Sequence, residues 1–260
     1  MLSIYQKWLM KKVSNWNDIT LNQFIEIHQL PKDDEFQYLS LSIIYDVSQD
    51  EIDELDIEEF EKLQTYLGFM AKLPTKPATN ITLKSTNLTF IDDFTKLSLG
   101  EWIDIENLIT KDVVGNLPLL ASILFRKMIV GDDFEPDKIE PYGSFIQHRS
   151  ILFGECTMAD VYGIIPIILT FRDLIHKNYE GLFGGAEEIV ENFELLEETP
   201  QEKLERLNEE KQEKYKNKWG WDIIVHNLAK GDITKFNEIY NLPLVMVLNF
   251  MSMQSELKLT

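Results

Sequence analysis

Residues 94–129 read FTKLSLGEWIDIENLITKDVVGNLPLLASILFRKMI, and this stretch decides the fold because its pattern recurs elsewhere in the chain. The segment SLGEW at 98–102 resembles TLNQF at 20–24, and SILF at 122–125 resembles SIIY at 42–45. The repeated pattern predicts a short capped helix, a loop and a buried helix. A weaker third copy is predicted in residues 232–253.

The start of the repeated unit carries a helix-capping pattern. Ser98 and Thr20 are predicted N-caps, because a hydroxyl accepts a hydrogen bond from the amide three residues on. Glu101 and Gln23 lie where a side chain reaches back to the cap, which completes a capping box in each copy. Apolar residues then recur on one helical face after each cap.

The tetrapeptide Asn-Leu-Pro-Leu occurs at 116–119 and again at 241–244. We expect both asparagines to be N-caps, with each proline in the first turn, where a missing N–H group costs nothing. The helices that follow are apolar on most sides, so we expect both to be core. The period of roughly 80 residues is longer than that of solenoid repeats, which argues against a repeat array.

Composition sets broad limits on the class of protein. The chain has 260 residues, 44% hydrophobic content and a net charge of −19. This charge argues against direct nucleic-acid binding, since phosphate contacts need Lys and Arg, and it favours a basic partner.

The single cysteine fits a reducing compartment. The start of the chain shows no signal-peptide pattern, and the longest uncharged apolar run, 161–171, is too short to cross a bilayer, so we expect a soluble protein without membrane contact.

The segment 33–61 carries twelve acidic residues and no basic one. A charge run of this kind is usually a solvated face, but isolated helices normally balance their charges with i,i+4 pairs. Docking of a basic partner therefore stays open beside the solvated face. Within this region, Asp56 is predicted to cap a helix over 57–72, with Phe60, Leu63, Leu67 and Met70 as its inner stripe.

Residues 79–92 change character, because Thr and Ile alternate around a Ser85-Thr86-Asn87 turn. This pattern predicts a short β-hairpin or an extended linker, which must lie against helices or pair with another chain. We expect strand addition here, so that Ile81→Pro or Leu88→Pro disrupts assembly but leaves the helical signal nearly intact. The thinly striped helix predicted at 200–218 is the other expected contact surface.

Two later helices carry specific expectations. Thr157 is predicted to cap one long buried helix over 158–177, kinked at Pro166. The last helix is predicted over 243–257. Met246 and Met253 either fill core gaps, the favoured interpretation, or line an adaptable contact surface.

The sequence motifs indicate no catalytic, cofactor-binding or metal-binding residue. The four histidines lack zinc-site spacing, and no nucleotide-binding, hydrolase or kinase motif is present. Asp133, Glu135 and Asp137 alternate like calcium ligands, but the loop lacks the glycine and glutamate of an EF-hand. Cys156 with His148 and Glu155 is the sole thiol-site combination, and an inert buried cysteine is the commoner interpretation.

The sequence resembles uncharacterised proteins from the structural modules of tailed bacteriophages. The segments that carry this resemblance are residues 94–127, Ile139-Glu140-Pro141-Tyr142, the apolar helix at 157–173 and the closing segment 219–253. Such proteins accompany portal, head–tail connector, tail-ring and tail assembly chaperone genes. The resemblance implies a virion or virion-assembly role and carries over no active site.

Together these observations predict a mainly α fold, a multi-helical bundle with at most one short hairpin near 79–92. We expect an N-terminal helical region (1–78), a central helical core (79–185) and a C-terminal region with an acidic helix (186–260). The expected core residues are Trp102, Ile103, Ile105, Leu120, Ile123, Leu124, Ile164, Ile168, Phe171, Leu248 and Phe250.

The expected function is a non-enzymatic structural or assembly protein of a phage virion, assembled in the host cytoplasm. Its expected partners are portal, tail or neighbouring ring proteins and further copies of itself. The alternatives are a tail assembly chaperone absent from the virion, and an acidic adaptor or DNA mimic that inhibits a basic host protein.

Overall fold

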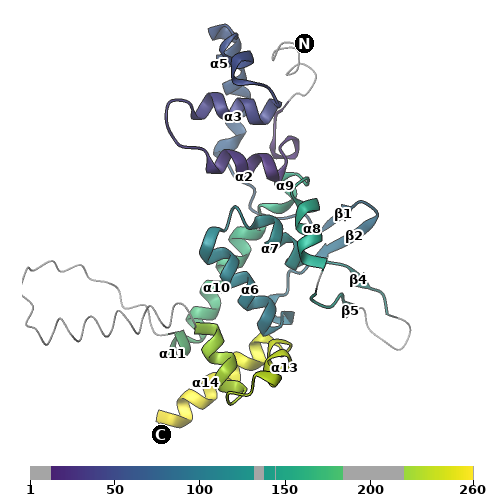
Figure 1. Cartoon of the computed structure of the whole chain (residues 1–260), viewed down its shortest axis with the longest axis vertical. Helices are drawn as coiled ribbons and strands as arrows, with labels where there is room; N and C mark the ends of the chain where they lie inside the picture. Colours follow the sequence, from purple (N-terminus) through teal and green to yellow (C-terminus); the bar gives the residue numbers. More distant parts are fainter. Residues whose placement is uncertain (1–12, 132–137, 144, 184–219, 260) are drawn as a thin grey trace, which may run out of the picture. The chain divides into compact units, whose positions relative to one another are not determined.

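The computed structural model describes residues 13–131, 138–143, 145–183 and 220–259, and these are mostly helical with two small antiparallel sheets (Figure 1). The predicted mainly α class is therefore confirmed, whereas the arrangement as a bundle stays a prediction. The chain divides into two compact units, which comprise residues up to 94 with 105–173, and residues 95–104 with 174 onward. The three predicted regions (1–78, 79–185 and 186–260) stay predictions.

The first unit contains helices and both sheets. Its elements are η1 (Trp16–Asp18), α2 (Leu21–Gln29), α3 (Phe36–Tyr45), α4 (Gln49–Asp53), α5 (Ile57–Tyr66), η2 (Leu67–Ala71), β1 (Asn80–Leu83), β2 (Thr86–Phe90), the end of α6 (Leu99–Asp112), α7 (Leu117–Leu124), β3 (Phe125–Arg126), β4 (Met128–Ile129), β5 (Lys138–Ile139), α8 (Phe145–Phe153), α9 (Met158–Val161) and most of α10 (Ile164–Asn178).

The second unit is helical in its described residues. It holds the start of α6, the end of α10 and the whole of α11 (Glu180–Phe183), a helix at 220–228, η4 (Ile233–Lys235), α13 (Phe236–Tyr240) and α14 (Leu244–Leu259). The short helix η3 (Phe94–Lys96) lies at the division between the units.

The predicted capping box at Thr20 is confirmed, and it is joined to a second helix start. The Gln23 amide donates to the Thr20 hydroxyl at 3.2 Å, and the Thr20 amide donates to the Gln23 side chain at 3.1 Å. The next residue, Leu21, donates its N–H to the Cys156 carbonyl at 2.9 Å, while Met158 donates its N–H to the Ile19 carbonyl at 2.8 Å. The starts of α2 and α9 are thus fastened by reciprocal backbone hydrogen bonds.

The second unit repeats this arrangement. The Ser98 capping box forms with Glu101, and Leu99 donates its N–H to the Leu242 carbonyl at 2.8 Å. In return, Leu244 donates its N–H to the Leu97 carbonyl at 2.9 Å, so the starts of α6 and α14 are fastened in the same way. Each unit therefore contains such a pair of helix starts among its described residues. In the first unit one member belongs to a predicted copy of the repeated pattern, and in the second unit both members do.

The two Asn-Leu-Pro-Leu segments adopt different structures. Asn116 stands at the N-cap position of α7, but its side chain donates to the Leu108 carbonyl at 3.0 Å instead of capping the helix. Asn241 ends α13, and its side chain donates to the Asn237 carbonyl. The prediction that Asn241 caps the last helix is wrong, because the residues before α14 are held extended by their bonds to Leu97 and Leu99.

The predicted hairpin is confirmed as β1 and β2, but its turn is Lys84-Ser85 and not Ser85–Asn87, because Thr86 and Asn87 are paired in β2. The limit of one hairpin is also wrong. The strand β3 joins β2 to make a three-stranded sheet in the order β1-β2-β3, and β4 pairs with β5 in a second sheet. Ile81 and Leu88 face each other across the hairpin and are buried within the unit. The hairpin therefore belongs to the core of its own unit, which contradicts the premise of the Ile81→Pro and Leu88→Pro prediction.

The helix predicted over 158–177 is two helices. Thr157 caps α9 as predicted, but α9 ends at Val161 and α10 begins at Ile164. The break falls at Gly163, where an added Cβ would clash with the carbonyl carbon of Lys76. Pro166 then lies in the first turn of α10, where it breaks no helical hydrogen bond, so the predicted kink is replaced by a break.

The predicted core is largely correct. Phe171 is half-buried and meets the Phe94 ring edge to face at 5.1 Å. Phe250 is exposed, so its assignment to the core is wrong. The remaining predicted core residues are buried: Trp102, Ile103, Ile105, Leu120, Ile123, Leu124, Ile164, Ile168 and Leu248.

Candidate functional site

The helix predicted over 57–72 leaves part of its inner stripe uncovered. The α-helix α5 ends at Tyr66, and η2 continues it as a 3-10 helix, which alters the direction of the later side chains. Near the start of α5, Phe60 stacks on Tyr38 of α3 at 4.7 Å. At the other end, Phe69 meets Trp16 edge to face at 5.2 Å. The segment is thus held near both ends, and Leu67 and Met70 are half-buried.

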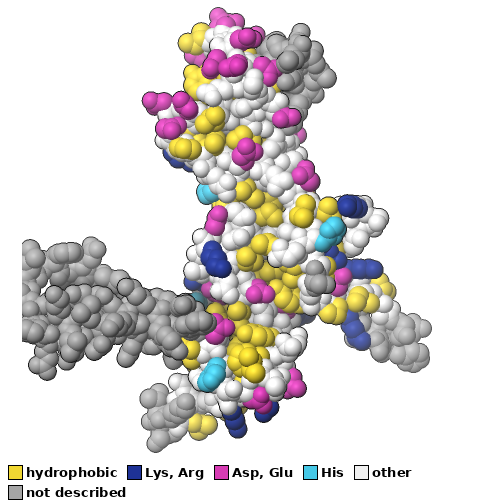
Figure 2. Space-filling view, viewed as in Figure 1, with side chains coloured by type: hydrophobic (Ala, Val, Ile, Leu, Met, Phe, Trp, Pro, Cys, Tyr) yellow, Lys and Arg dark blue, Asp and Glu magenta, His cyan; other side chains and the backbone are white. Residues whose placement is uncertain are grey.

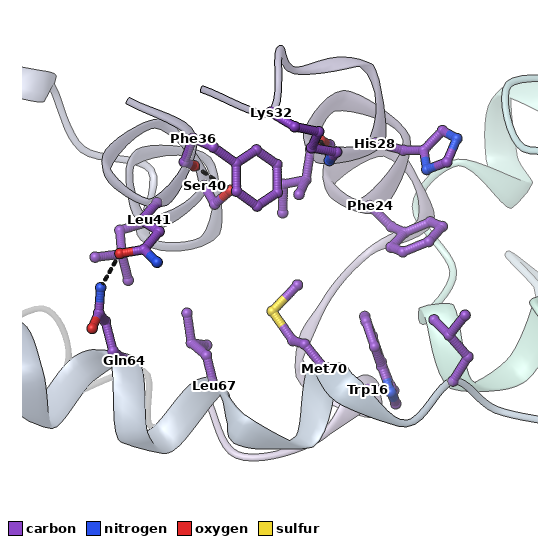
Figure 3. A pocket seen from close by; sticks show the side chains of 13 residues that line it. Trp16, Phe24, His28, Lys32, Phe36, Ser40, Leu41, Gln64, Leu67 and Met70 are labelled. Atoms are coloured by element: carbon purple, nitrogen blue, oxygen red, sulfur yellow. Dashed lines mark hydrogen bonds between the residues drawn. The ribbon is translucent and has the colours of Figure 1, made fainter. Parts of the chain in front are cut away.

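A hollow of about 420 Å³ lies between these two anchor points. Figure 3 shows Leu67 and Met70 pointing from α5–η2 toward α2 and α3, which contribute Phe24, Phe36 and Leu41 on the opposite side. We call this hollow the α2–α5 groove. Its full lining is Trp16, Phe24, Ile27, His28, Lys32, Phe36, Gln37, Ser40, Leu41, Gln64, Leu67, Met70 and Leu73.

Several polar groups of the groove already have partners within the chain. Gln64 donates to Gln37 across the groove. The Lys32 ammonium lies 3.7 Å from the centre of the Phe36 ring, a cation–π contact, and it also donates to the Ile27 carbonyl. Trp16 donates its indole N–H to the Lys72 carbonyl at 2.8 Å. The groove therefore presents mainly apolar surface.

The region around the groove is strongly acidic. Residues 14–73, which supply the groove lining, contain fourteen acidic and three basic residues, a net charge of −11. Figure 2 shows acidic side chains gathered over the part of the molecule that Figure 1 labels α3 and α5. The predicted acidic run at 33–61 thus borders an apolar hollow, which the sequence did not reveal.

A second uncovered surface lies on α14. Met246, Phe250, Met253 and Leu257 are 43–66% exposed, although Leu244, Val247 and Leu248 on the same helix are buried. The four exposed residues are spaced by four, three and four, so they form one stripe, which we call the α14 stripe. The prediction that Met246 and Met253 are core residues is wrong, because the opposite face of the helix packs instead.

The proposed thiol combination receives no support. The Cys156 thiol contacts the Leu152 carbonyl at 3.9 Å, and among the described residues no hydrogen bond joins it to His148 or Glu155. His148 is exposed on α8, and Glu155 accepts a hydrogen bond from Asn22. Burial, with the negative charges of Asp160 and Glu155, raises the pKa of the Cys156 thiol to about 11. A thiol of this kind is a poor nucleophile near neutral pH.

A buried arginine joins the end of α7 to the residue that follows β5. Arg126 is buried, and it donates to the carbonyls of Ile123 and Glu140 at 2.8 and 2.7 Å. Burial lowers its pKa to about 10, although the Glu140 carboxylate opposes this shift. Arg149 forms a two-bond ion pair with Glu140 at 2.7 and 3.0 Å. These bonds satisfy the buried charge, so the cluster has a structural explanation.

Several predictions lie outside the described residues. The alternating acids Asp133, Glu135 and Asp137 and the helix predicted at 200–218 belong to this group. In the parts of the chain that the structure describes, no group of three or more Asp, Glu, His or Cys side chains is placed to hold a metal ion. Within the same parts, no helix combines the length and apolar character needed to span a bilayer.

No family model matches the chain, and comparisons with curated proteins and with solved structures find no match either. Two uncovered apolar surfaces of the described residues, the α2–α5 groove and the α14 stripe, are the features that bear on function.

Proposed function

We propose that the protein is a non-enzymatic structural or assembly protein of a tailed-bacteriophage virion, a ring or connector component of the head–tail junction or tail. The observation that carries the proposal is the α14 stripe, a row of large apolar side chains exposed on one helix. An exposed apolar row is unfavourable in water and indicates an interaction site. The sequence resemblance to phage structural modules supplies the biological setting.

The spacing of the stripe favours a helical partner. Met246, Phe250, Met253 and Leu257 occupy alternating a and d positions of two heptads, the pattern by which helices pack side by side. Two heptads are fewer than the three or four that sustain a coiled coil alone, so the stripe adds to a larger contact. A ring supplies such a contact, because each subunit meets a neighbour on either side.

The proposal implies particular partners and a location. The helices pack as a multi-helical bundle, and the stripe meets other copies of the chain or the portal, tail and neighbouring ring proteins. Direct contact with nucleic acid or membrane is not part of the role, and the protein resides in the virion after assembly in the host cytoplasm.

Mass spectrometry of purified particles tests the virion role. We expect the protein in stoichiometric copies, as a ring component requires. Its absence from particles whose assembly depends on it would identify the alternative, a tail assembly chaperone. Particles that form normally without the protein would contradict both roles.

The size of the purified protein tests the use of the α14 stripe. Light scattering is expected to give a mass above the 30.4 kDa of one chain. Phe250→Glu is expected to lower that mass, because it places a charge in the stripe. Ile233→Glu is the matched control, since Ile233 is 75% exposed and lies outside the stripe. Equal behaviour of the two variants would contradict the assignment.

The acidic run at 33–61 supports a second candidate, an acidic adaptor or DNA mimic that blocks a basic host protein. Such binding is electrostatic and weakens with salt. A pull-down from host lysate at low and at high salt tests it. Failure to retain a basic protein at low salt would remove this candidate.

A further inference from the structure

We propose that the α2–α5 groove is a docking site for an amphipathic helix of a partner protein, with apolar residues on one face and Lys or Arg on the other. The proposal does not depend on the phage role, because it rests on the groove and its surroundings alone. It also concerns a different surface from the α14 stripe.

The lining of the groove suits a row of apolar anchors. Phe24, Phe36 and Leu41 lie on one side, and Leu67 and Met70 on the other (Figure 3). Helices that bind in grooves present apolar side chains at positions i, i+3 or i+4, and i+7, which reach one continuous apolar channel. Met70 adds adaptability, since its unbranched side chain packs against anchors of different shapes.

The negative charge around the groove favours basic residues on the outward face of the partner helix. Residues 14–73 carry a net charge of −11, and the chain as a whole carries −19. These 60 residues therefore hold more than half of the chain's net negative charge. A helix whose outward face bears Lys or Arg gains from this field both in its approach and in its bound state. Lys32, which lines the groove, is already counted in this net charge, and its ammonium lies over the Phe36 ring.

Other occupants match fewer of these observations. A small apolar ligand fits the volume, which lies within the range of ligand pockets, but makes no use of the acidic surroundings. A second copy of the acidic region would be repelled by charges of the same sign. A basic amphipathic helix uses both the apolar lining and the negative field.

Fluorescence anisotropy with the full chain tests the proposal. The probe is a labelled amphipathic peptide of about 15 residues, long enough to form a helix, with Leu on one face and Lys on the other. The comparison peptide has Glu in place of every Lys. We expect the Lys peptide to bind, the Glu peptide to bind at least about tenfold more weakly, and added salt to weaken the Lys peptide.

Two substitutions distinguish the groove from general charge attraction. Met70→Lys changes the groove lining, and Ile57→Lys makes the same charge change on α5 at a residue that is 75% exposed and does not line the groove. We expect Met70→Lys to weaken peptide binding about tenfold or more and Ile57→Lys to weaken it about twofold or less. Leu67→Ser is a second groove variant that leaves the charge unchanged, and circular dichroism confirms that each variant is folded.

Three results would overturn the proposal. Equal weakening by Met70→Lys and Ile57→Lys would show attraction to the acidic surface without use of the groove. Equal binding of the Lys and Glu peptides would remove the charge argument. Binding of a small apolar dye that Met70→Lys abolishes, without peptide binding, would assign the groove to a small ligand. A failure of the phage role would appear in the particle analysis and leave these binding results unaffected.

Discussion

The hairpin of β1 and β2 allows a sharp test of which backbone groups hold the first unit together. Phe90 donates its N–H to the Thr79 carbonyl at 2.9 Å, so residues 79 and 90 form a hydrogen-bonded pair. In an antiparallel ladder such pairs alternate, and the register Ile81↔Leu88 therefore places the next hydrogen-bonded pair at Ile81. Thr82 lies between such pairs, so its N–H points away from β2, toward the free edge of the sheet.

Proline substitutions on β1 should therefore differ in cost. Ile81→Pro removes a ladder hydrogen bond, worth about 1 kcal/mol, and part of a buried apolar side chain, worth roughly 1–2 kcal/mol more. We expect it to lower the free energy of unfolding by about 2–4 kcal/mol. Thr82→Pro removes an N–H that points away from the sheet, and edge strands tolerate proline there, so its cost should be below about 1 kcal/mol.

Urea denaturation followed by far-ultraviolet circular dichroism measures both variants. The expected difference corresponds to a shift of at least several degrees in the unfolding temperature. Equal destabilisation by Ile81→Pro and Thr82→Pro would refute the register argument. If the free edge also accepts a strand from a neighbouring subunit, Thr82→Pro reduces the size of the assembly while leaving stability nearly unchanged.

Two further predictions concern close contacts in the first unit. Gly163→Ala should lower the free energy of unfolding, measured by urea denaturation, by at least about 2 kcal/mol, because the added Cβ would meet the backbone of Lys76 and Pro77. Gly143→Ala is the control and should change this free energy little, because its Cβ meets no described atom within 4 Å. Similar effects of both alanines would contradict the close approach. Glu140→Gln should cost roughly 1–2 kcal/mol at neutral pH by weakening the bonds from Arg149. Burial raises the pKa of Glu140, but the hydrogen bonds and charge of Arg149 outweigh it, so this pKa lies below its ordinary value. Its stabilising effect is then present above the pKa of an unfolded glutamate, near 4.3, and is lost as the pH falls through the lower folded value. Denaturation between about pH 7 and pH 3 should therefore show the variant and the natural protein converging in acid, and a constant difference would contradict the ion pair.

Local chemistry explains which predictions from the sequence are correct. The capping boxes at Thr20 and Ser98 depend on residues three positions apart, and both form as predicted. Asn241 shows the limit of such reasoning. The same tetrapeptide begins a helix at 116–119, but at 241–244 bonds to a distant segment determine its conformation. The break between α9 and α10 at Gly163 could not be predicted from the neighbouring residues either, because the glycine lies against the distant backbone of Lys76 and Pro77.

The two candidate surfaces were predictable only in part. The acidic run and the inner stripe of residues 57–72 were visible in the sequence, but the groove depends on how α2 and α3 pack against α5–η2. The residues Phe36 and Leu41 carry no sequence signal that separates a groove wall from a core. On α14, apolar residues surround the helix, so composition alone did not distinguish the packed face from the exposed one.

The paired helix starts explain why the sequence repeat is strongest where it is. In each unit, reciprocal bonds join the residues around two caps, so both segments must be extended before their helices begin. A glycine also lies at each pair of joined segments. An added Cβ at Gly154 would meet the Asn22 side chain in the first unit, and one at Gly100 would meet the Tyr240 side chain and backbone in the second, so the glycine lies on the opposite partner in each pair. The two pairs therefore share their reciprocal backbone bonds but differ in which segment carries the glycine. The α2–α5 groove and the α14 stripe both lie on residues outside these joined caps, so substitutions that test docking or assembly leave the paired helix starts intact.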